Sequence, residues 1–207
     1  MPPPAGRTGR PRSAEAHSAI LRATRTALAE LGWSRLSMSD VAARAGVART
    51  TLYRRWPGKN ELVVDAVAAL LDEQLELPDS GSLAGDIEGV VLRFAQLLER
   101  PETRSALMAV IAESTRDPAL RERVTAAIVD RQKALVLRGR ERARARGELP
   151  PETDEAASAR ESDLVFDVIA GTVVHRALVS GEPVDAEWAR RFTRMVLGGL
   201  PALTAEG

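Results

Sequence analysis

Apolar residues along this chain recur at intervals of three and four, and no stretch keeps the alternating pattern of a strand. This period is typical of amphipathic helices, so the sequence predicts an all-α fold. Ser37, with Asp40 three residues later, has the pattern of a capping box at the start of a short helix. The first four helices are expected at residues 13–31, 37–46, 48–56 and 59–77, with Gly32 ending the first of them.

Turn residues separate the longer helices expected in the rest of the chain. Pro101 and Pro118 stand where first-turn prolines belong, and Gly147 and Gly181 each follow a helical pattern and precede proline. These helices are expected at residues 83–99, 102–115, 118–146, 154–180 and 185–199. The alternate arginines near residue 140 spread around their helix, and we expect them to form a solvated helix end. They are Arg138, Arg140, Arg142, Arg144 and Arg146.

Residues 38–56 have the spacing of a helix-turn-helix. Ala42 is the small residue that a crossing second helix requires, and Gly46, four residues later, permits the positive φ of the turn. Apolar contacts between the two helices are expected from Val41, Ala45, Val47 and Leu52. Hydroxyl and cationic side chains then follow, as contacts in a DNA major groove require. They are Arg49, Thr50, Thr51, Tyr53, Arg54 and Arg55.

The alternative is a plain helical hairpin. A separate alternative for Tyr53 is packing against the first helix, and at least one of Arg54 and Arg55 is expected to be solvated. The charge distribution favours the DNA-binding interpretation. Residues 1–60 contain 11 Lys and Arg against 3 Asp and Glu, a net charge of +8, and residues 61–207 contain 18 against 26, a net charge of −8. A basic module that meets a polyanion, joined to an acidic module that does not, explains this division.

The chain therefore divides into three expected parts. Residues 1–12 form a disordered basic arm, residues 13–60 a three-helix helix-turn-helix domain of the homeodomain-like kind, and residues 61–207 a helical regulatory and dimerisation domain. Arg10 and Arg12 in the arm lie among glycine and proline, a composition that suits a narrow minor groove. A tail that adds only non-specific attraction explains the same residues equally well.

Residues 45–62 carry a resemblance to a known family. The segment Ala-Gly-Val-Ala-Arg-Thr-Thr-Leu-Tyr-Arg-Arg-Trp-Pro-Gly-Lys-Asn-Glu-Leu is similar to the signature of the tetracycline-repressor (TetR/AcrR) family of bacterial transcription regulators. The resemblance covers residues 13–63 and continues more weakly beyond them. Trp56 stands where phenylalanine is more usual, and Gly58 replaces a capping hydroxyl.

The resemblance implies roles for individual residues. Thr51 and Tyr53 match positions that touch DNA phosphates, and Lys59 matches a lysine that contacts the DNA backbone from the start of the fourth helix. Arg49 and Thr50 match positions that read bases. Ser37 and Ser39 match hydroxyls that meet phosphate at the start of the second helix, and Arg54 is added as a further DNA contact.

The C-terminal part has two apolar helix faces and a set of candidate ligand contacts. We expect the last two long helices to form an intermolecular four-helix bundle, because a palindromic site requires a two-fold partner. The alternative is burial within one chain. The residues expected at the interface of the intermolecular bundle are Leu164, Val168, Thr172, Trp188, Phe192 and Met195. The resemblance also implies a small-molecule effector in this part. Candidate contacts are Phe94, Leu97, Leu98, Met108, Ile111, Phe166, Ile169 and His175.

Composition excludes several other classes of protein. The chain has no cysteine, so a thiol nucleophile and a zinc ribbon are ruled out, and with only two histidines most histidine-dependent catalysis is poorly supported. Its apolar runs are far shorter than the roughly 18–20 residues of a membrane span. We expect a cytoplasmic, non-enzymatic regulator without cofactor or metal, most simply a ligand-responsive repressor that binds a palindromic operator as a homodimer. The alternatives are an activator or global regulator, or a helical ligand-binding protein or enzyme without a DNA role.

Overall fold

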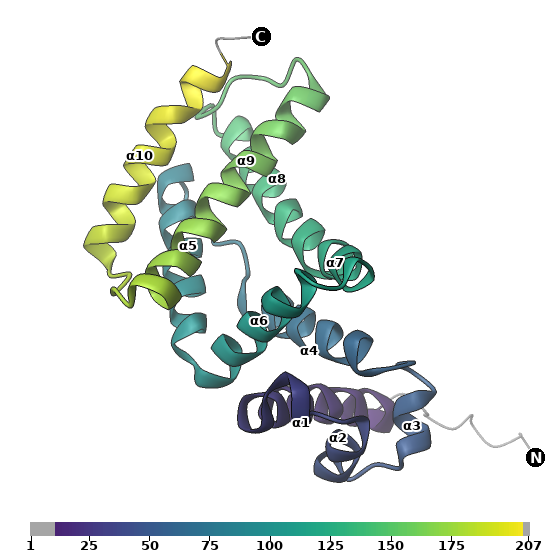
Figure 1. Ribbon diagram of the computed structural model, residues 1–207. Helices are drawn as coiled ribbons and strands as arrows, with labels where there is room; N and C mark the ends of the chain where they lie inside the picture. The colour runs from purple at the N-terminus through teal and green to yellow at the C-terminus, as the bar shows by residue number, and fades with distance from the viewer. Residues whose placement is uncertain (1–10, 205–207) are drawn as a thin grey trace, which may run out of the picture.

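The computed structural model describes residues 11–204, with side chains for residues 14–199. It confirms the all-α prediction, because every regular element among the described residues is helical. Figure 1 shows α1–α3 gathered at one end of the molecule, with α4 leading from them to the remaining helices.

The four N-terminal helices lie close to their predicted positions. They are α1 (Pro11–Arg35), α2 (Met38–Ala45), α3 (Arg49–Tyr53) and α4 (Lys59–Gln74). Gly32 interrupts α1, because its φ of 72° and ψ of 169° are not helical, and a short turn follows it. Since α1 begins at Pro11, the last two residues of the expected disordered arm are helical. Residues 1–10, with Arg10, and the side chain of Arg12 lie outside the described part.

The C-terminal helices contain two features that periodicity did not predict. They are α5 (Leu83–Glu99), α6 (Pro101–Ser114), α7 (Pro118–Val124), η1 (Thr125–Val129), α8 (Asp130–Ala145), α9 (Glu155–Val174), η2 (His175–Ser180) and α10 (Ala186–Thr204). The single helix expected over 118–146 contains the π-helical stretch η1, and the one expected over 154–180 ends in the π-helical stretch η2. A π-helical turn holds one extra residue, so it changes which side chains face inward along the helix.

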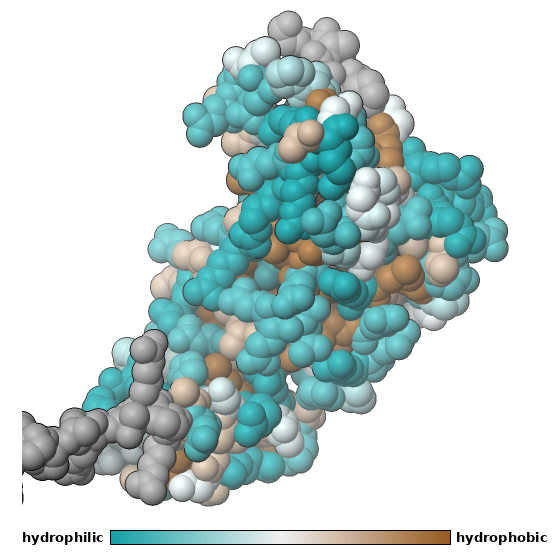
Figure 2. All heavy atoms as spheres, turned by 180° about the vertical axis from the view of Figure 1, so that it is seen from behind, coloured by the Kyte–Doolittle hydropathy of each residue, from teal (hydrophilic) through white to brown (hydrophobic). Residues whose placement is uncertain are grey.

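Two apolar cores hold these helices together. The first joins α1–α4 to α6, α7 and η1, and it includes Leu52, Leu71, Val110 and Ile128. The second joins α5, α8, α9 and α10. Seen from behind in Figure 2, the surface is mainly hydrophilic, and apolar atoms appear in recesses between the helices. The first core continues across residue 60, so α4 packs with both expected domains.

Of the five arginines near residue 140, which were expected to form a solvated helix end, Arg138 is exposed, but the other four are buried or half-buried. Arg140 is 7% exposed and pairs with Glu161. Arg144 donates to Ser158 Oγ at 2.7 Å, and Arg146 Nη2 donates to Asp86 Oδ2 at 3.1 Å. These three side chains instead tie the C-terminal part of α8 to α9 and to the start of α5.

Asp86 is the centre of the polar cluster that fastens the start of α5 to the end of α8. It is 1% exposed, and its Oδ1 accepts hydrogen bonds from Ser80 N at 2.7 Å and Ser80 Oγ at 2.8 Å. Burial alone would raise the pKa of Asp86, but the hydrogen bonds from Ser80 and Arg146 outweigh it and hold that pKa below its usual range.

Acid should therefore destabilise the protein through this carboxylate. The ionised form of Asp86 makes these hydrogen bonds, so its contribution to stability is present at neutral pH and is lost as the pH falls through its lowered pKa. We expect Asp86→Asn to unfold more readily than the unmodified chain at pH 7, with a difference that shrinks as the pH approaches about 3. Urea unfolding of both proteins between pH 3 and 7 measures this, and a difference independent of pH would contradict it.

Candidate nucleic-acid interface and internal cavity

The turn between α2 and α3 has the geometry that the sequence predicted. Asp40 N donates to Ser37 Oγ at 3.2 Å, and Ser37 N donates to Asp40 Oδ2 at 3.1 Å, which completes the capping box. The hydrogen bond from the Ser37 side chain holds the pKa of Asp40 below its usual value. Gly46 ends α2 in the left-handed region, with φ 66°. This turn directs the chain across α2 and into α3.

Two buried side chains hold α3 in place. Leu52 is fully buried, and Trp56, which follows α3, is 2% exposed. The Trp56 indole stacks on the His17 ring with 5.3 Å between ring centroids, and its Nε1 donates to Asp65 Oδ2 at 2.8 Å. Because α3 is only five residues long, its orientation depends on these contacts more than on its own hydrogen bonds.

The opposite side of α3 is open to solvent. Arg49, Thr50, Tyr53 and Arg54 are exposed, and Thr51 is half-buried. Tyr53 keeps 53% of its surface exposed, so it is not buried against α1 as the alternative interpretation required. Five of the six side chains that the sequence assigned to the major groove therefore lie together on α3 and its cap residue Arg54, and the sixth, Arg55, is half-buried.

The other assigned residues flank α3. Ser37 is exposed and Ser39 half-buried at the start of α2. Lys59, at the start of α4, donates from Nζ to Trp33 O at 2.9 Å and lies over the Trp33 ring, 5.0 Å from its centroid. An ammonium group has three donors. Lys59 therefore joins α4 to the turn after α1 and retains donors for a phosphate.

A polar connection links α3 to the C-terminal helices through Asp65 of α4. Asp65 Oδ2 accepts from Trp56 Nε1, and Asp65 Oδ1 lies 3.0 Å from Arg123 Nη2 on α7. A second link nearby joins Asn60 Nδ2 to Asp117 Oδ2, the cap of α7, at 3.2 Å. A shift of α7 relative to α4 would therefore act on the residue that holds α3.

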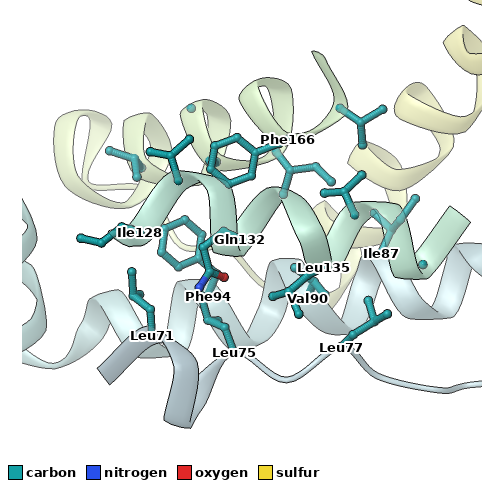
Figure 3. A pocket seen from close by; sticks show the side chains of 18 of the residues that line it. Leu71, Leu75, Leu77, Ile87, Val90, Phe94, Ile128, Gln132, Leu135 and Phe166 are labelled. Atoms are coloured by element: carbon teal, nitrogen blue, oxygen red, sulfur yellow. The ribbon is translucent and has the colours of Figure 1, made fainter. Parts of the chain in front are cut away.

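An internal cavity of about 360 Å³ lies among α4, α5, α6, η1, α8 and α9. Figure 3 shows side chains from several of these helices converging on it, with Phe94 and Phe166 among them. Most of the described residues that line it are apolar, and its polar side chains are Asp86, Gln132 and Arg140. The cavity meets η1 through Ile128 and Val129, and η1 packs directly against α4.

The structure brings four of the eight candidate ligand contacts together at this cavity. Phe94, Ile111, Phe166 and Ile169 line it. The other four are not among its lining residues. Leu97 and Leu98 are buried in the two apolar cores, Met108 is 41% exposed on α6, and His175 is exposed at the start of η2, 3.4 Å from Ser180 Oγ. Sequence reasoning missed Gln132 and Arg140, whose polar side chains gave no signal of an inward position.

The proposed dimer residues differ in how much surface they keep within one chain. Leu164 is 45% exposed and Met195 62% exposed. Val168, Thr172 and Trp188 are half-buried, and the Trp188 ring stacks on Phe192 at 5.0 Å between centroids. Phe192 itself is 5% exposed, because α10 packs against α5, so it has little surface left for a partner.

Comparison with known proteins assigns both halves of the chain. Residues 20–66 match the model of "Bacterial regulatory proteins, tetR family", and residues 77–196 match "Tetracyclin repressor-like, C-terminal domain". The HTH-type transcriptional regulator Rv1556 of Mycobacterium tuberculosis is 32% identical over 187 residues, which are 89% of this chain and 86% of that protein.

Two further relatives agree. The DNA-binding transcriptional repressor TetR of Mycobacteroides abscessus is 31% identical over 186 residues, which are 87% of this chain and 90% of that protein. The solved structure of the TetR family transcription regulator SCO0332 has a TM-score of 0.71 and 26% identity, and the match covers 89% of this chain and 98% of that one.

The chain belongs to the TetR family of helix-turn-helix transcription regulators. Membership confirms the resemblance seen in residues 45–62 and assigns double-stranded DNA as a partner. It also excludes the alternative of an enzyme or binding protein without a DNA role, because the family is one of non-enzymatic regulators. Among residues 11–204, no helix combines the length and apolar character that crossing a membrane requires.

Proposed function

We propose that this protein is a homodimeric repressor that binds a palindromic operator and is released by a small-molecule effector. The observation that carries the proposal is the exposed face of α3, held from behind by Leu52 and Trp56. A regulator that binds the chromosome acts in the cytoplasm. The name of the Mycobacteroides abscessus relative, a transcriptional repressor, supports repression rather than activation.

The recognition surface divides into base-reading and phosphate-binding residues. Arg49 and Thr50, at the start of α3, are positioned as base contacts, because the N-terminal residues of a recognition helix reach base edges. Thr51, Tyr53 and Arg54 follow as phosphate contacts. Ser37, Ser39 and Lys59 bind the backbone at the sides of the groove, and Arg10 and Arg12 extend the basic surface toward the minor groove.

Dimerisation uses the outer faces of α9 and α10. Leu164 and Met195 are large apolar side chains that the single chain leaves open, and Val168, Thr172 and Trp188 lie on the same two helices. Two copies pair these helices into a four-helix bundle, and the two α3 helices then meet successive major grooves, about 34–36 Å apart or a multiple of that distance.

The effector occupies the internal cavity and acts by differential affinity for two conformations. Occupancy presses on η1 and α7, which pack against α4, and Arg123, Asp65 and Trp56 carry the displacement to α3. The two recognition helices then change their separation. Release follows because the effector-bound form no longer matches the operator spacing, without any blocking of α3.

Substitutions on and beside α3 should distinguish the residues that contact bases from those that contact phosphates. We expect Arg49→Ala and Thr50→Ala to change the preferred sequence, with a loss of about 1–3 kcal/mol at the base pair each contacts. Tyr53→Phe removes one hydroxyl and should weaken binding equally for all sequences. Lys59→Ala should also weaken binding uniformly, with added loss from its contacts to Trp33. Selection of bound duplexes from a random library, with each variant, measures both effects.

Arg138→Ala serves as the matched control, because Arg138 is exposed on α8, whose main helix contacts are with α5, α9 and η1. It should leave both sequence preference and affinity unchanged. If Arg49→Ala and Tyr53→Phe each lowered the binding affinity equally for all duplexes, the division into base-contacting and phosphate-contacting residues would be contradicted. The sign of regulation is tested separately, since deletion of the gene should raise, not lower, transcription from the operators that the selection finds.

A further inference from the structure

The lining of the cavity restricts the chemistry of the molecule that fits it. The cavity holds about 360 Å³, and the described residues around it include aliphatic and aromatic side chains from α4, α5, α6, η1, α8 and α9. A surface of this kind favours apolar ligands, and a few polar groups then decide orientation and specificity. Asp86, Gln132 and Arg140 are the polar side chains among those residues.

One face of α8 forms a continuous wall of the cavity. The lining residues of α8 are Gln132, Leu135, Val136, Gly139 and Arg140, which recur at helical spacing. Gln132 and Arg140 stand at the two ends of this wall, eight residues apart. At a rise of about 1.5 Å per residue, their α-carbons are separated by about 12 Å along the helix axis. The cavity is therefore elongated along α8.

Gln132 brings an unsatisfied amide to this apolar surface. It is 9% exposed, and its side chain makes no hydrogen bond with any residue that the structure describes. Figure 3 shows the amide directed among the apolar side chains of the lining. A buried amide without partners is unfavourable, and such groups in native proteins are rare. A ligand with a hydroxyl or carbonyl group would satisfy it.

The charged groups of the lining are already neutralised. Arg140 donates from Nη2 to Glu161, and its buried Nε has no partner among the described residues. Asp86 is paired with Arg146. A carboxylate or ammonium ligand would therefore enter an apolar space without a free counter-charge, and burying an unpaired charge is costly. Arg140 Nε is itself fully buried, so it offers no hydrogen bond to a molecule in the cavity.

The arginines of the neighbouring groove do not supply that counter-charge. The groove lies between the end of α4 and α8 and shares Leu75, Leu77, Gln132 and Leu135 with the cavity. Arg131 pairs with Asp72, and Arg142 donates to Pro78 O at 3.0 Å. Arg138 is exposed to solvent, which screens its charge.

We propose that the effector is an uncharged, elongated and mainly apolar molecule with an oxygen-containing group that bonds to the Gln132 amide. The class includes long-chain diols, hydroxy esters and diesters. This inference rests on the proposed function, since it takes the cavity to be the effector site. It goes beyond that function by stating which chemical class the site selects and which residue selects it.

Matched compounds test the class. The probes are α,ω-substituted straight chains of eight to twelve carbons, as diols, dimethyl esters, dicarboxylates and diamines, each titrated calorimetrically into the full-length protein at pH 8. We expect the diols and diesters to bind at least tenfold more tightly than the charged compounds of equal length. Tighter binding of the dicarboxylates or diamines, or no binding by any neutral probe up to its solubility, would overturn the inference.

A substitution at Gln132 tests the selecting residue. Gln132→Leu keeps the size of the side chain and removes the amide, so we expect about tenfold weaker binding of the best neutral probe and a melting temperature about 2–4 °C higher without probe. Gln96→Leu makes the same change at an exposed position of α5 and should leave probe affinity unchanged. Unchanged affinity in Gln132→Leu, or a lower melting temperature, would contradict the role of the amide.

Operator release separates this inference from the proposed function. The probe that binds best is added to the complex of the protein with its selected operator. Release of the DNA supports both proposals. If the DNA stays bound while the probe is also bound, the effector role is contradicted. The ligand class of the cavity is then judged by the calorimetric titrations alone.

Discussion

Replacing either Leu164 or Met195 with glutamate should abolish the dimer and, with it, high-affinity operator binding. Both side chains are large and apolar, and the single chain leaves them 45% and 62% exposed. In the proposed four-helix bundle each becomes buried. An unpaired charge buried there costs several kcal/mol, so dimer affinity should fall by about 100-fold or more per substitution. Sedimentation velocity measures the association state, and gel shift with the selected operator measures DNA binding.

The folded monomer should survive these substitutions, because exposed positions tolerate polar residues within about 0.5 kcal/mol. Met108→Glu is the matched control. Met108 is 41% exposed on α6, away from α9 and α10, so its substitution should leave the dimer intact. A stable dimer in both Leu164→Glu and Met195→Glu, with normal operator affinity, would show that the interface lies elsewhere.

Trp56→Ala should cost about 3–5 kcal/mol of folding stability, the range for removing a buried tryptophan. Trp56 is 2% exposed, and it contacts the His17 ring and the Asp65 carboxylate. Its removal leaves a void directly behind α3, so DNA binding should be lost even where the rest of the chain remains folded. Chemical denaturation and gel shift measure the two effects independently.

Trp56→Phe provides the graded comparison. Phenylalanine fills most of the space but has no Nε1 donor, so it should lose about 0.5–1.5 kcal/mol for the hydrogen bond to Asp65 and should still bind DNA. A Trp56→Ala protein that unfolds at the same denaturant concentration as the unmodified chain would contradict the assigned role of this side chain.

Sequence reasoning located α1–α4 well because local chemistry fixes their ends. The Ser37–Asp40 capping box starts α2, and Gly46 ends it in a left-handed conformation that its lack of a side chain permits. The end of α4 was placed three residues too late. Leu75, with φ −105° and ψ 69°, leaves the helical region and carries its side chain to the cavity, while Pro78 disfavours helical geometry before it.

The cavity was harder to anticipate. An apolar periodic pattern indicates which face of a helix is inward, but it does not indicate whether facing side chains fill the space between helices. The π-helical stretch η1 also shifts the register within 118–145, so the inward face changes along one apparent helix. Arg140 was expected to be solvated because the alternate arginines spread around their helix. Its position is set by Glu161, 21 residues away, which no local pattern reveals.

The recognition surface illustrates the same division between local and long-range determinants. Exposure of Arg49 and Tyr53 follows from the local pattern around Leu52, since the buried residue fixes the orientation of a short helix. The connection from Trp56 through Asp65 to Arg123 joins residues far apart in the sequence, since the last two are separated by 58 positions. Only the assembled fold brings these three groups together and links the cavity to α3.

The central claim is that a dimer presents two copies of the α3 face to one palindromic duplex. The most direct measurement is selection of bound sequences from random double-stranded DNA with the full-length protein, followed by footprinting of the selected duplex. The account predicts an inverted repeat whose half-sites are centred about one helical turn apart or a multiple of that distance, protected on both half-sites at once. Recovery of no preferred duplex at low ionic strength, or of a single unrepeated site bound by one chain, would contradict it.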